Sequence, residues 1–430
     1  MNLFGAMEIK NNEFYVGGIS AKELANQYGT PLYVMDEGLI KKNCRDYFEN
    51  FMCKERKNRV AFAGKACMNM AICEIVKNEG LYLDVVSGGE LYTAYKSDFP
   101  MEKIYFHGNN KTFDEIELGV KLGVGTFVVD NYTELEYLDK LAKKYDKIQN
   151  IYLRITPGIE AHTHEYIQTG QLDSKFGIAL MDNNVIDVVR HILEFENIKL
   201  VGLHSHIGSQ IFDLKPFEDE VEIMLELMNN IYKNCGVRLE ELDLGGGFGI
   251  YYANGDNPKT TAEYCNAILN KADEVCHRLN YPMPVLSIEP GRSIVGNAGL
   301  TLYTVGAIKT IPGIRTYAAI DGGMGDNIRT ALYEAEYECL VANRVEGENE
   351  DVTIAGKCCE SGDIIIKNAY IPKLQTRDIL AVLSTGAYGY SMASNYNRIP
   401  RPAMIMVENN NSRVVCKRES YEDLIRNEYK

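Results

Sequence analysis

The spacing of hydrophobic positions changes twice along the chain, near residue 59 and again after residue 291. Between these points, short runs that are almost entirely apolar alternate with stretches in which apolar residues recur every three to four positions. The first pattern is typical of strands buried on both faces, and the second of amphipathic helices. We therefore predict parallel strands separated by helices. The predicted strands are Arg59–Gly64, Leu81–Val86, Lys103–Gly108, Gly125–Asp130, Ile151–Thr156, Lys199–His206, Leu239–Gly245 and Pro284–Pro290.

Eight strand–helix repeats over roughly 230 residues match a closed (β/α)8 barrel, a TIM-like fold that typically needs about 250 residues. A doubly wound open sheet is the structural alternative. The predicted helices include Met68–Asn78, Tyr132–Tyr145, Lys215–Asn234 and Thr261–Leu279. Asn131 is placed to cap the second of them, because an Asn side chain can accept from the exposed N–H groups of a helix start.

After residue 291 the helical spacing nearly disappears. Short strand-like segments follow, separated by Gly, Asn and Pro, which is typical of antiparallel sheets. The acidic segment Glu346–Asp351 reads as a solvated turn. We expect an N-terminal segment 1–35 that packs with the β-domain, a barrel over 36–291, and a C-terminal β-sandwich or β-barrel domain over 292–430.

Composition narrows the function classes. The 430 residues include 45 Lys and Arg against 60 Asp and Glu, a formal charge of -15. Such a surface repels nucleic-acid phosphates and anionic lipids, so neither is an expected partner. No apolar run approaches the roughly 18 residues of a membrane helix, and no signal peptide is expected. The 11 Cys are scattered without C-x-x-C pairs, which favours a reduced, cytoplasmic protein.

Chemically distinctive residues gather where the predicted strands end. In a (β/α)8 barrel, catalytic residues lie at these C-terminal ends. Lys65 ends the first strand among small neighbours, where burial would make its amine a nucleophile able to form a Schiff base. The alternative is a lysine that leaves the barrel into solvent. The remaining candidates at strand ends are Asp84, His107, Arg154, His204, His206, Gly245–Gly249 and Glu289.

Two of these positions suggest ligand groups, an anion at the glycine run and a ring nitrogen at Glu289. Gly245–Gly249 lets backbone N–H groups converge on an anion, and Ser209 would add a hydroxyl. The glycine run matches neither a dinucleotide nor a Walker motif, and a tight strand–helix turn is the alternative. Glu289 could hold a pyridine nitrogen protonated, and Arg292 could bind a phosphate or a carboxylate. The alternative for these two is a buried ion pair.

Two His-x-His pairs, His162/His164 and His204/His206, raise a zinc hypothesis. Residues i and i+2 of a strand share a face, and barrel hydrolases use such pairs as metal ligands. A separate Asp ligand is not obvious, and His206 could instead stack on a flat aromatic cofactor.

Taken in order along the chain, the motifs resemble those of the barrel-type (fold-type III) decarboxylases that depend on pyridoxal 5'-phosphate (PLP). The resemblance covers essentially the full length. It is carried by Lys65 and by Asp84–Glu90, His107–Lys111, Ala161–Gly177, Gly202–Gln210, Gly245–Gly249, Glu289–Arg292, Asp321–Tyr333, Cys359–Asp363 and Gly386–Asn397. Phe62 and Cys67 depart mildly from the family's pattern beside the lysine.

The resemblance implies decarboxylation of meso-2,6-diaminopimelate to L-lysine and CO2, the last step of lysine biosynthesis. It implies Lys65 as the Schiff-base lysine, His206 stacked on the ring, and Cys359 as the proton donor candidate. The implied cofactor-binding set is Lys65, Asp84, His206, Ser209, Gly245, Gly246, Gly247, Glu289, Gly291, Arg292 and Tyr388. The implied substrate-binding set is Arg292, Arg329, Tyr333, Glu360 and Tyr388. Cys359 and Glu360 would come from the partner subunit of a homodimer.

Three rival functions remain open at this stage. A sister decarboxylase could act on ornithine, arginine, lysine or carboxynorspermidine, although Cys359-Glu360 with Arg329 and Tyr333 favours a substrate that keeps a distal amino-acid head. A metal-dependent barrel hydrolase would contain zinc. A non-catalytic PLP carrier would bind the cofactor without turnover, but Lys65, Cys359 and Glu360 are all present.

Overall fold

The computed structural model describes residues 1–52, 57–159, 174–181 and 184–430. It divides into two compact units. Unit 1 comprises Met1–Asn43, Ile250–Asn257 and Arg292–Lys430, and unit 2 comprises Cys44–Gly249 and Pro258–Gly291. Among the described helices, none has the length and apolar character needed to cross a membrane.

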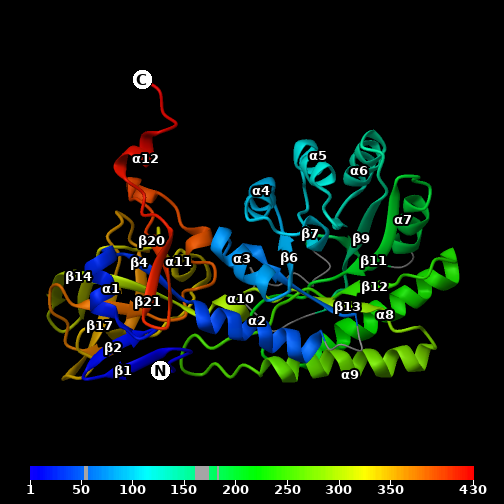
Figure 1. Ribbon diagram of the computed structural model, residues 1–430. Coiled ribbons are helices and arrows are strands. Elements are labelled where there is room, and N and C mark those ends of the chain that lie inside the picture. The colour runs from blue at the N-terminus through cyan, green and yellow to red at the C-terminus, as the bar shows by residue number, and fades with distance from the viewer. Residues whose placement is uncertain (53–56, 160–173, 182–183) are drawn as a thin grey trace. The chain divides into compact units, whose positions relative to one another are not determined.

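Unit 2 is a closed barrel of parallel strands (Figure 1). Each strand pairs in parallel with its neighbours, and the β13–β5 and β8–β9 pairings close the ring. This confirms the predicted (β/α)8 barrel and rules out the doubly wound alternative. The barrel strands are β5 (Arg59–Ala63), β6 (Tyr82–Val85), β7 (Ile104–Phe106), β8 (Thr126–Val129), β9 (Gln149–Thr156), β11 (Ile198–His204), β12 (Glu241–Asp243) and β13 (Val285–Ile288), and β10 (Ile178–Ala179) adds to β9.

Helices follow the strands and lie around the barrel (Figure 1). Asn131 caps α6 as predicted, because its side-chain oxygen accepts from the Glu134 N–H at 3.0 Å. Thr112 and Thr260 start capping boxes at α5 and α9, which satisfy the exposed N–H groups of both helix starts. These helices are α3 (Met70–Asn78), α4 (Gly88–Lys96), α5 (Phe113–Leu122), α6 (Tyr132–Lys144), α7 (Asn184–Ile192), α8 (Lys215–Cys235) and α9 (Thr261–Leu279), and α2 (Glu37–Phe51) precedes the first barrel strand.

Side chains fill the barrel near the N-terminal ends of its strands. The Arg59 guanidinium donates to both carboxylate oxygens of Glu241, at 2.7 and 2.8 Å. Tyr152 donates to the same carboxylate, and the buried Tyr105 ring packs against Tyr152 at 5.4 Å between ring centroids. This packing occupies the strand starts, so the chemistry is left to the opposite, C-terminal ends.

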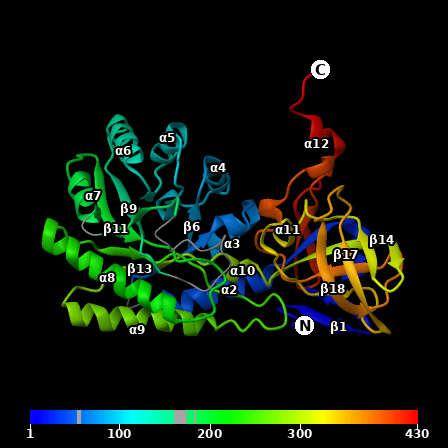
Figure 2. The ribbon, with the colours of Figure 1, turned by 180° about the vertical axis from the view of Figure 1, so that it is seen from behind.

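Unit 1 consists of sheets with short helices (Figure 2). β1 (Met7–Lys10), β2 (Glu13–Val16) and β3 (Ile19–Ser20) form a small antiparallel sheet, followed by α1 (Ala21–Tyr28). The larger sheet has the order β18-β17-β15-β14-β4-β20-β21, with β19 pairing to β14 and β16. Its strands are β4 (Leu32–Asp36), β14 (Gly299–Ile311), β15 (Arg315–Ile320), β16 (Cys339–Val341), β17 (Asn349–Ala355), β18 (Ile364–Pro372), β19 (Ile379–Val382), β20 (Ala403–Glu408) and β21 (Asn411–Cys416).

Most pairings in the larger sheet are antiparallel, as predicted, but β15–β17 and β4–β20 are parallel. Successive side chains of β14 point to opposite faces and enter different hydrophobic clusters, Leu302 one and Tyr303 the other. The segment Glu346–Asp351, read from the sequence as a turn, enters β17 at Asn349. Asp351 is exposed, so its strand position leaves a charged side chain in water.

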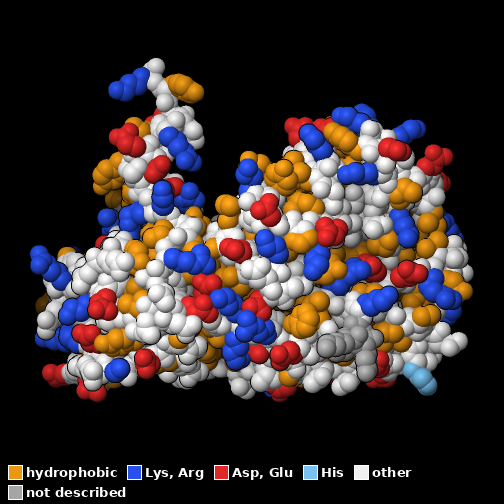
Figure 3. Space-filling view, in the orientation of Figure 1, with side chains coloured by type: hydrophobic (Ala, Val, Ile, Leu, Met, Phe, Trp, Pro, Cys, Tyr) orange, Lys and Arg blue, Asp and Glu red, His pale blue; other side chains and the backbone are white. Residues whose placement is uncertain are grey.

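The charged side chains are mixed on the face shown in Figure 3. Lys and Arg lie interspersed with Asp and Glu on both units there. Opposite charges at short range cancel much of each other's field beyond a Debye length, about 8 to 10 Å at physiological salt.

Candidate active site

Lys65 lies at the mouth of the barrel, on a single 3-10 turn (Gly64–Ala66) that directly follows β5. The turn requires glycine at position 64, because a Cβ there would lie 2.8 Å from the Asp84 carbonyl oxygen. The lysine is exposed, so the sequence-based expectation of a desolvated lysine is wrong for this structure. Its positive charge acts to lower the pKa values of Asp84, Glu90 and His206.

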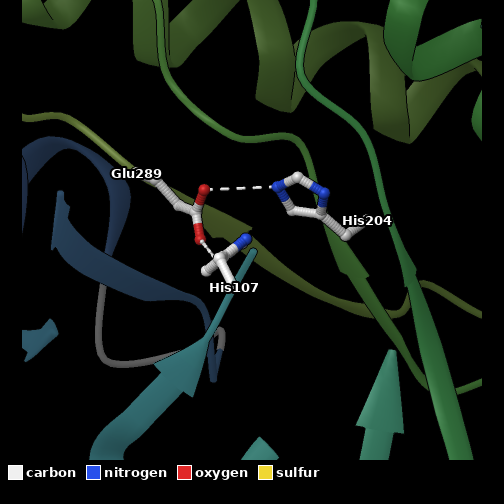
Figure 4. A group of neighbouring side chains, drawn as sticks. All are labelled: His107, His204 and Glu289. Carbon is white, nitrogen blue, oxygen red and sulfur yellow. Dashed lines mark hydrogen bonds and ion pairs between the residues drawn. The ribbon is translucent and has the colours of Figure 1, made fainter. Parts of the chain in front are cut away.

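Glu289 follows β13 and is held between two imidazoles (Figure 4). His107 Nε2 lies 2.6 Å from one carboxylate oxygen and His204 Nε2 lies 3.2 Å from the other. All three residues are buried. Burial alone would raise the pKa of Glu289, but the electrostatic attraction of His107 and His204 and their hydrogen bonds outweigh it and hold the pKa well below its usual range. Glu289 is therefore a buried carboxylate anion.

His204 serves this anion as a neutral donor. Burial lowers the pKa of His204 to about 3, although the charge of Glu289 acts in the opposite direction. A neutral imidazole carries one N–H, and an ionised carboxylate can only accept, so the proton is on Nε2. The His204 ring thereby fixes one oxygen of Glu289 without adding a charge.

Two further acids lie around Glu289. Burial raises the pKa of Asp84 to about 6 against the charge of His107, whose Nε2 is 3.8 Å from Asp84 Oδ1. Burial and the charge of Glu289 raise the pKa of Asp243, at the end of β12, well above its usual range. Asp243 was not singled out from the sequence, although an acid between two leucines just before a glycine run was an available signal.

The glycine run after β12 has no room for side chains. A Cβ on Gly246 would lie 2.2 Å from the Glu289 carbonyl oxygen, and a Cβ on Gly247 would lie 2.5 Å from the Gly208 carbonyl oxygen. Gly245 and Gly247 have φ of +60° and +113°, a region that favours glycine. The backbone thus comes close to Glu289 and to the loop that carries Ser209.

His206 lies against this glycine loop. Its Nδ1 accepts from the Gly246 N–H at 3.3 Å, and burial, together with the charge of Lys65, lowers the pKa of His206 well below its usual range. His204 and His206 therefore contact different groups rather than pairing as zinc ligands. The donor atoms of His107, His204 and Glu289 do lie within 4.8 Å of one another. His162 and His164 lie outside the described residues.

Unit 1 contains a second cluster of predicted residues. Arg292 opens α10 (Arg292–Val295) and Arg329 opens α11 (Arg329–Tyr333), and both are buried. Tyr388 has φ of +60°, and its ring centroid lies 4.8 Å from Arg292 Cζ and 5.9 Å from Arg329 Cζ. Tyr333 is half-buried at the end of α11. The structure thus brings both arginines and Tyr388 together.

Cys359 and Glu360 lie on an exposed turn between β17 and β18. The Cys359 N–H donates to Asn397 Oδ1 at 2.7 Å, which fixes the backbone of the turn and leaves the thiol accessible.

Gly291, the last residue of unit 2, packs so closely that a Cβ would lie 2.9 Å from the Ala63 Cβ.

The residues at the barrel mouth fit PLP. Glu289 is an anion placed to accept from a pyridinium N–H, the glycine loop packs directly beside it, and Lys65 offers an accessible amine for covalent attachment. The site therefore has the features of a pyridoxal enzyme built on a (β/α)8 barrel.

The family model for the pyridoxal-dependent decarboxylase, pyridoxal binding domain, matches residues 37–296. This chain belongs to that family. Diaminopimelate decarboxylase of Bacillus subtilis (strain 168) is 48% identical over 412 residues, covering 96% of this chain and 94% of that protein. The enzyme of the same name from Staphylococcus aureus (strain COL) is 45% identical and covers 98% and 99%.

Solved structures show the same likeness over the whole fold. The crystal structure of diaminopimelate decarboxylase from M. jannaschii superposes with a TM-score of 0.93 at 38% identity, covering 99% of this chain and 98% of that one. The structure in co-complex with L-lysine matches equally well. A lysine/ornithine decarboxylase from Vibrio vulnificus, at 20% identity and a TM-score of 0.77, shows the shared fold alone.

Proposed function

We propose that this protein decarboxylates meso-2,6-diaminopimelate to L-lysine and CO2 with PLP as its cofactor. The observation that carries the proposal is Glu289, a buried anion held by two imidazoles at the mouth of the barrel. The identity of 48% with a diaminopimelate decarboxylase supports the choice of substrate.

The residues at the barrel mouth would each act at one part of the cofactor. When bound, PLP supplies an electron sink for the pair left behind as CO2 departs. Glu289 holds a proton at the pyridine nitrogen, which keeps the ring cationic and favours that electron flow. Lys65 Nζ would provide the covalent attachment, His206 would contact the ring, and Ser209 and Gly245–Gly247 would hold the phosphate together with the segment at Gly291 and Arg292. Asp84 Oδ1 lies 3.8 Å from His107 Nε2, and Asp84 would act on the cofactor through His107.

The substrate needs cationic and anionic partners together. Arg292, Arg329, Tyr333 and Tyr388 bind its carboxylates. Glu360 of the partner subunit binds the distal ammonium, and Cys359 of the partner subunit returns a proton to the former Cα. We propose a homodimer with shared sites for this reason. We also propose the cytoplasm as its location, since the ten described cysteines are all free thiols.

The test is CO2 release from meso-diaminopimelate, ornithine, lysine and arginine, each with and without added PLP. We expect PLP-dependent release from diaminopimelate alone. Glu289→Gln should lower that release by about a hundred-fold or more, because a neutral amide cannot hold the ring nitrogen protonated. The matched control is Glu274→Gln on the surface of α9, which should retain the parent rate. Release from another amino acid would correct the substrate, and release without PLP would overturn the proposal.

A further inference from the structure

The two buried arginines of unit 1 are held by tyrosine hydroxyls. Arg292 donates to Tyr252 Oη at 2.6 Å, and Arg329 donates to Tyr337 Oη at 2.5 Å. Tyr252 and Tyr337 are themselves 6% and 5% exposed, so both hydrogen bonds are shielded from water. Hydrogen bonds from a charged donor in such surroundings are stronger than those between neutral groups.

The aromatic ring of Tyr252 lies near both cations. Tyr252 lies 5.6 Å from Arg292 Cζ and 5.0 Å from Arg329 Cζ, measured to the ring centroid. Tyr337 lies 5.8 Å from Arg329 Cζ and packs edge-on against Tyr252 at 5.3 Å. A cation within about 6 Å of an aromatic ring is attracted to it. Tyr252 thus contacts both guanidinium groups through its ring, and its hydroxyl also accepts from Arg292.

A buried guanidinium charge is costly unless something compensates it. Burial would raise the pKa of Tyr252, but the charges of Arg292 and Arg329 outweigh it and lower the pKa. In the described part of the chain, no carboxylate forms an ion pair with Arg329, which is 7% exposed and has tyrosines as its partners. Arg329 therefore suits an anion that the described residues do not themselves supply.

We propose that Tyr252 and Tyr337 are positioning residues that set the place and spacing of the Arg292 and Arg329 guanidinium groups, and through them the affinity for the carboxylates of the substrate. This inference rests on the proposed function for the identity of the substrate. Neither tyrosine belongs to the predicted site, because Tyr252 lies in a loop after the glycine run and Tyr337 lies beyond the end of α11.

The experiment compares the PLP-loaded parent with Tyr252→Phe and Tyr337→Phe, which keep the rings and remove the hydroxyls. Each should raise the KM for diaminopimelate about ten-fold or more while kcat changes by less than about two-fold, as expected when a bond that serves binding is lost. Affinity for pimelate, a seven-carbon dicarboxylate without amino groups, should fall by a similar factor in calorimetric titration.

Tyr28→Phe is the matched control, because it removes another hydroxyl hydrogen bond of unit 1, the one to Ser412 at 2.8 Å. It should bind substrate and pimelate as the parent does. Arg329→Lys keeps the charge but loses the planar fork, and it should weaken pimelate binding as well. If both Phe variants match Tyr28→Phe in KM and pimelate affinity, or if only kcat falls, the positioning role is refuted. If the parent itself fails to decarboxylate diaminopimelate, the proposed function fails, while the pimelate titration still tests the tyrosines.

Discussion

Asp326 and Glu289 are both buried carboxyl groups, but their neighbours shift them in opposite directions. Two imidazoles stabilise the charged form of Glu289. Asp326, in the loop after β15, is surrounded by other acids, and burial together with the charges of Asp321 and Asp363 raises its pKa to about 7, although the Gly323 N–H opposes this. The charge of a buried acid therefore depends on which partners it has, and this cannot be read from the acid itself.

The raised pKa of Asp326 makes stability depend on pH. Below about pH 4 the group is protonated in both the folded and the unfolded chain and has no effect. Between about pH 4 and 7 Asp326 is ionised in the unfolded chain but still largely protonated in the folded one. The free energy of unfolding therefore falls by up to about 1.4 kcal/mol per pH unit. Above pH 7 the loss is complete.

Asp326→Asn should remove this pH dependence of stability. We expect the Tm of the variant, relative to that of the parent, to rise steadily from pH 4 to pH 7 and to stay level above it. Thermal unfolding followed by circular dichroism across this range measures the effect. Asp187→Asn, on the exposed face of α7, is the control and should track the parent. Parallel curves for Asp326→Asn and the parent would contradict the expectation.

At the scale of elements, the barrel strands were predictable because each is a continuous apolar run bounded by polar residues. The strand ends also singled out Lys65, Asp84, His206 and Glu289 as candidate site residues, since a barrel collects its strand ends on one face. The short α11 and the contacts of Tyr252 were not predictable. They depend on pairing between segments far apart in sequence, for which local spacing carries no signal.

The glycine loop after β12 gives an element-scale prediction. Gly246→Ala places a methyl group 2.2 Å from the Glu289 carbonyl oxygen, so the loop or β13 must shift. We expect a folded protein whose PLP affinity is at least about ten-fold weaker, measured by titrating the absorbance of the bound cofactor. Gly306→Ala, whose Cβ would meet its nearest atom at an ordinary 3.5 Å, should bind PLP as the parent does. Unchanged affinity in Gly246→Ala would show that the loop does not hold the phosphate.

At the scale of the whole molecule, a shared site predicts complementation between two inactive variants. Lys65→Ala and Cys359→Ala are each expected to be nearly inactive. When they are unfolded and refolded together, mixed dimers regain one intact site, and activity should reach about a quarter of the parent's if subunits pair at random. Mixing Lys65→Ala with a Lys65→Met variant should restore nothing. Failure of every Lys65→Ala and Cys359→Ala mixture would argue that each subunit carries a complete site.

The position of β4 within its sheet also bears on how the chain is made. All five residues of this strand are buried, and both its neighbours, β14 and β20, begin roughly 260 residues or more downstream. At ordinary rates of translation the ribosome needs on the order of tens of seconds to supply them. During that interval an apolar strand emerges without its partners. Synthesis therefore includes a period in which the nascent chain exposes an aggregation-prone strand, long before the sheet can close around it.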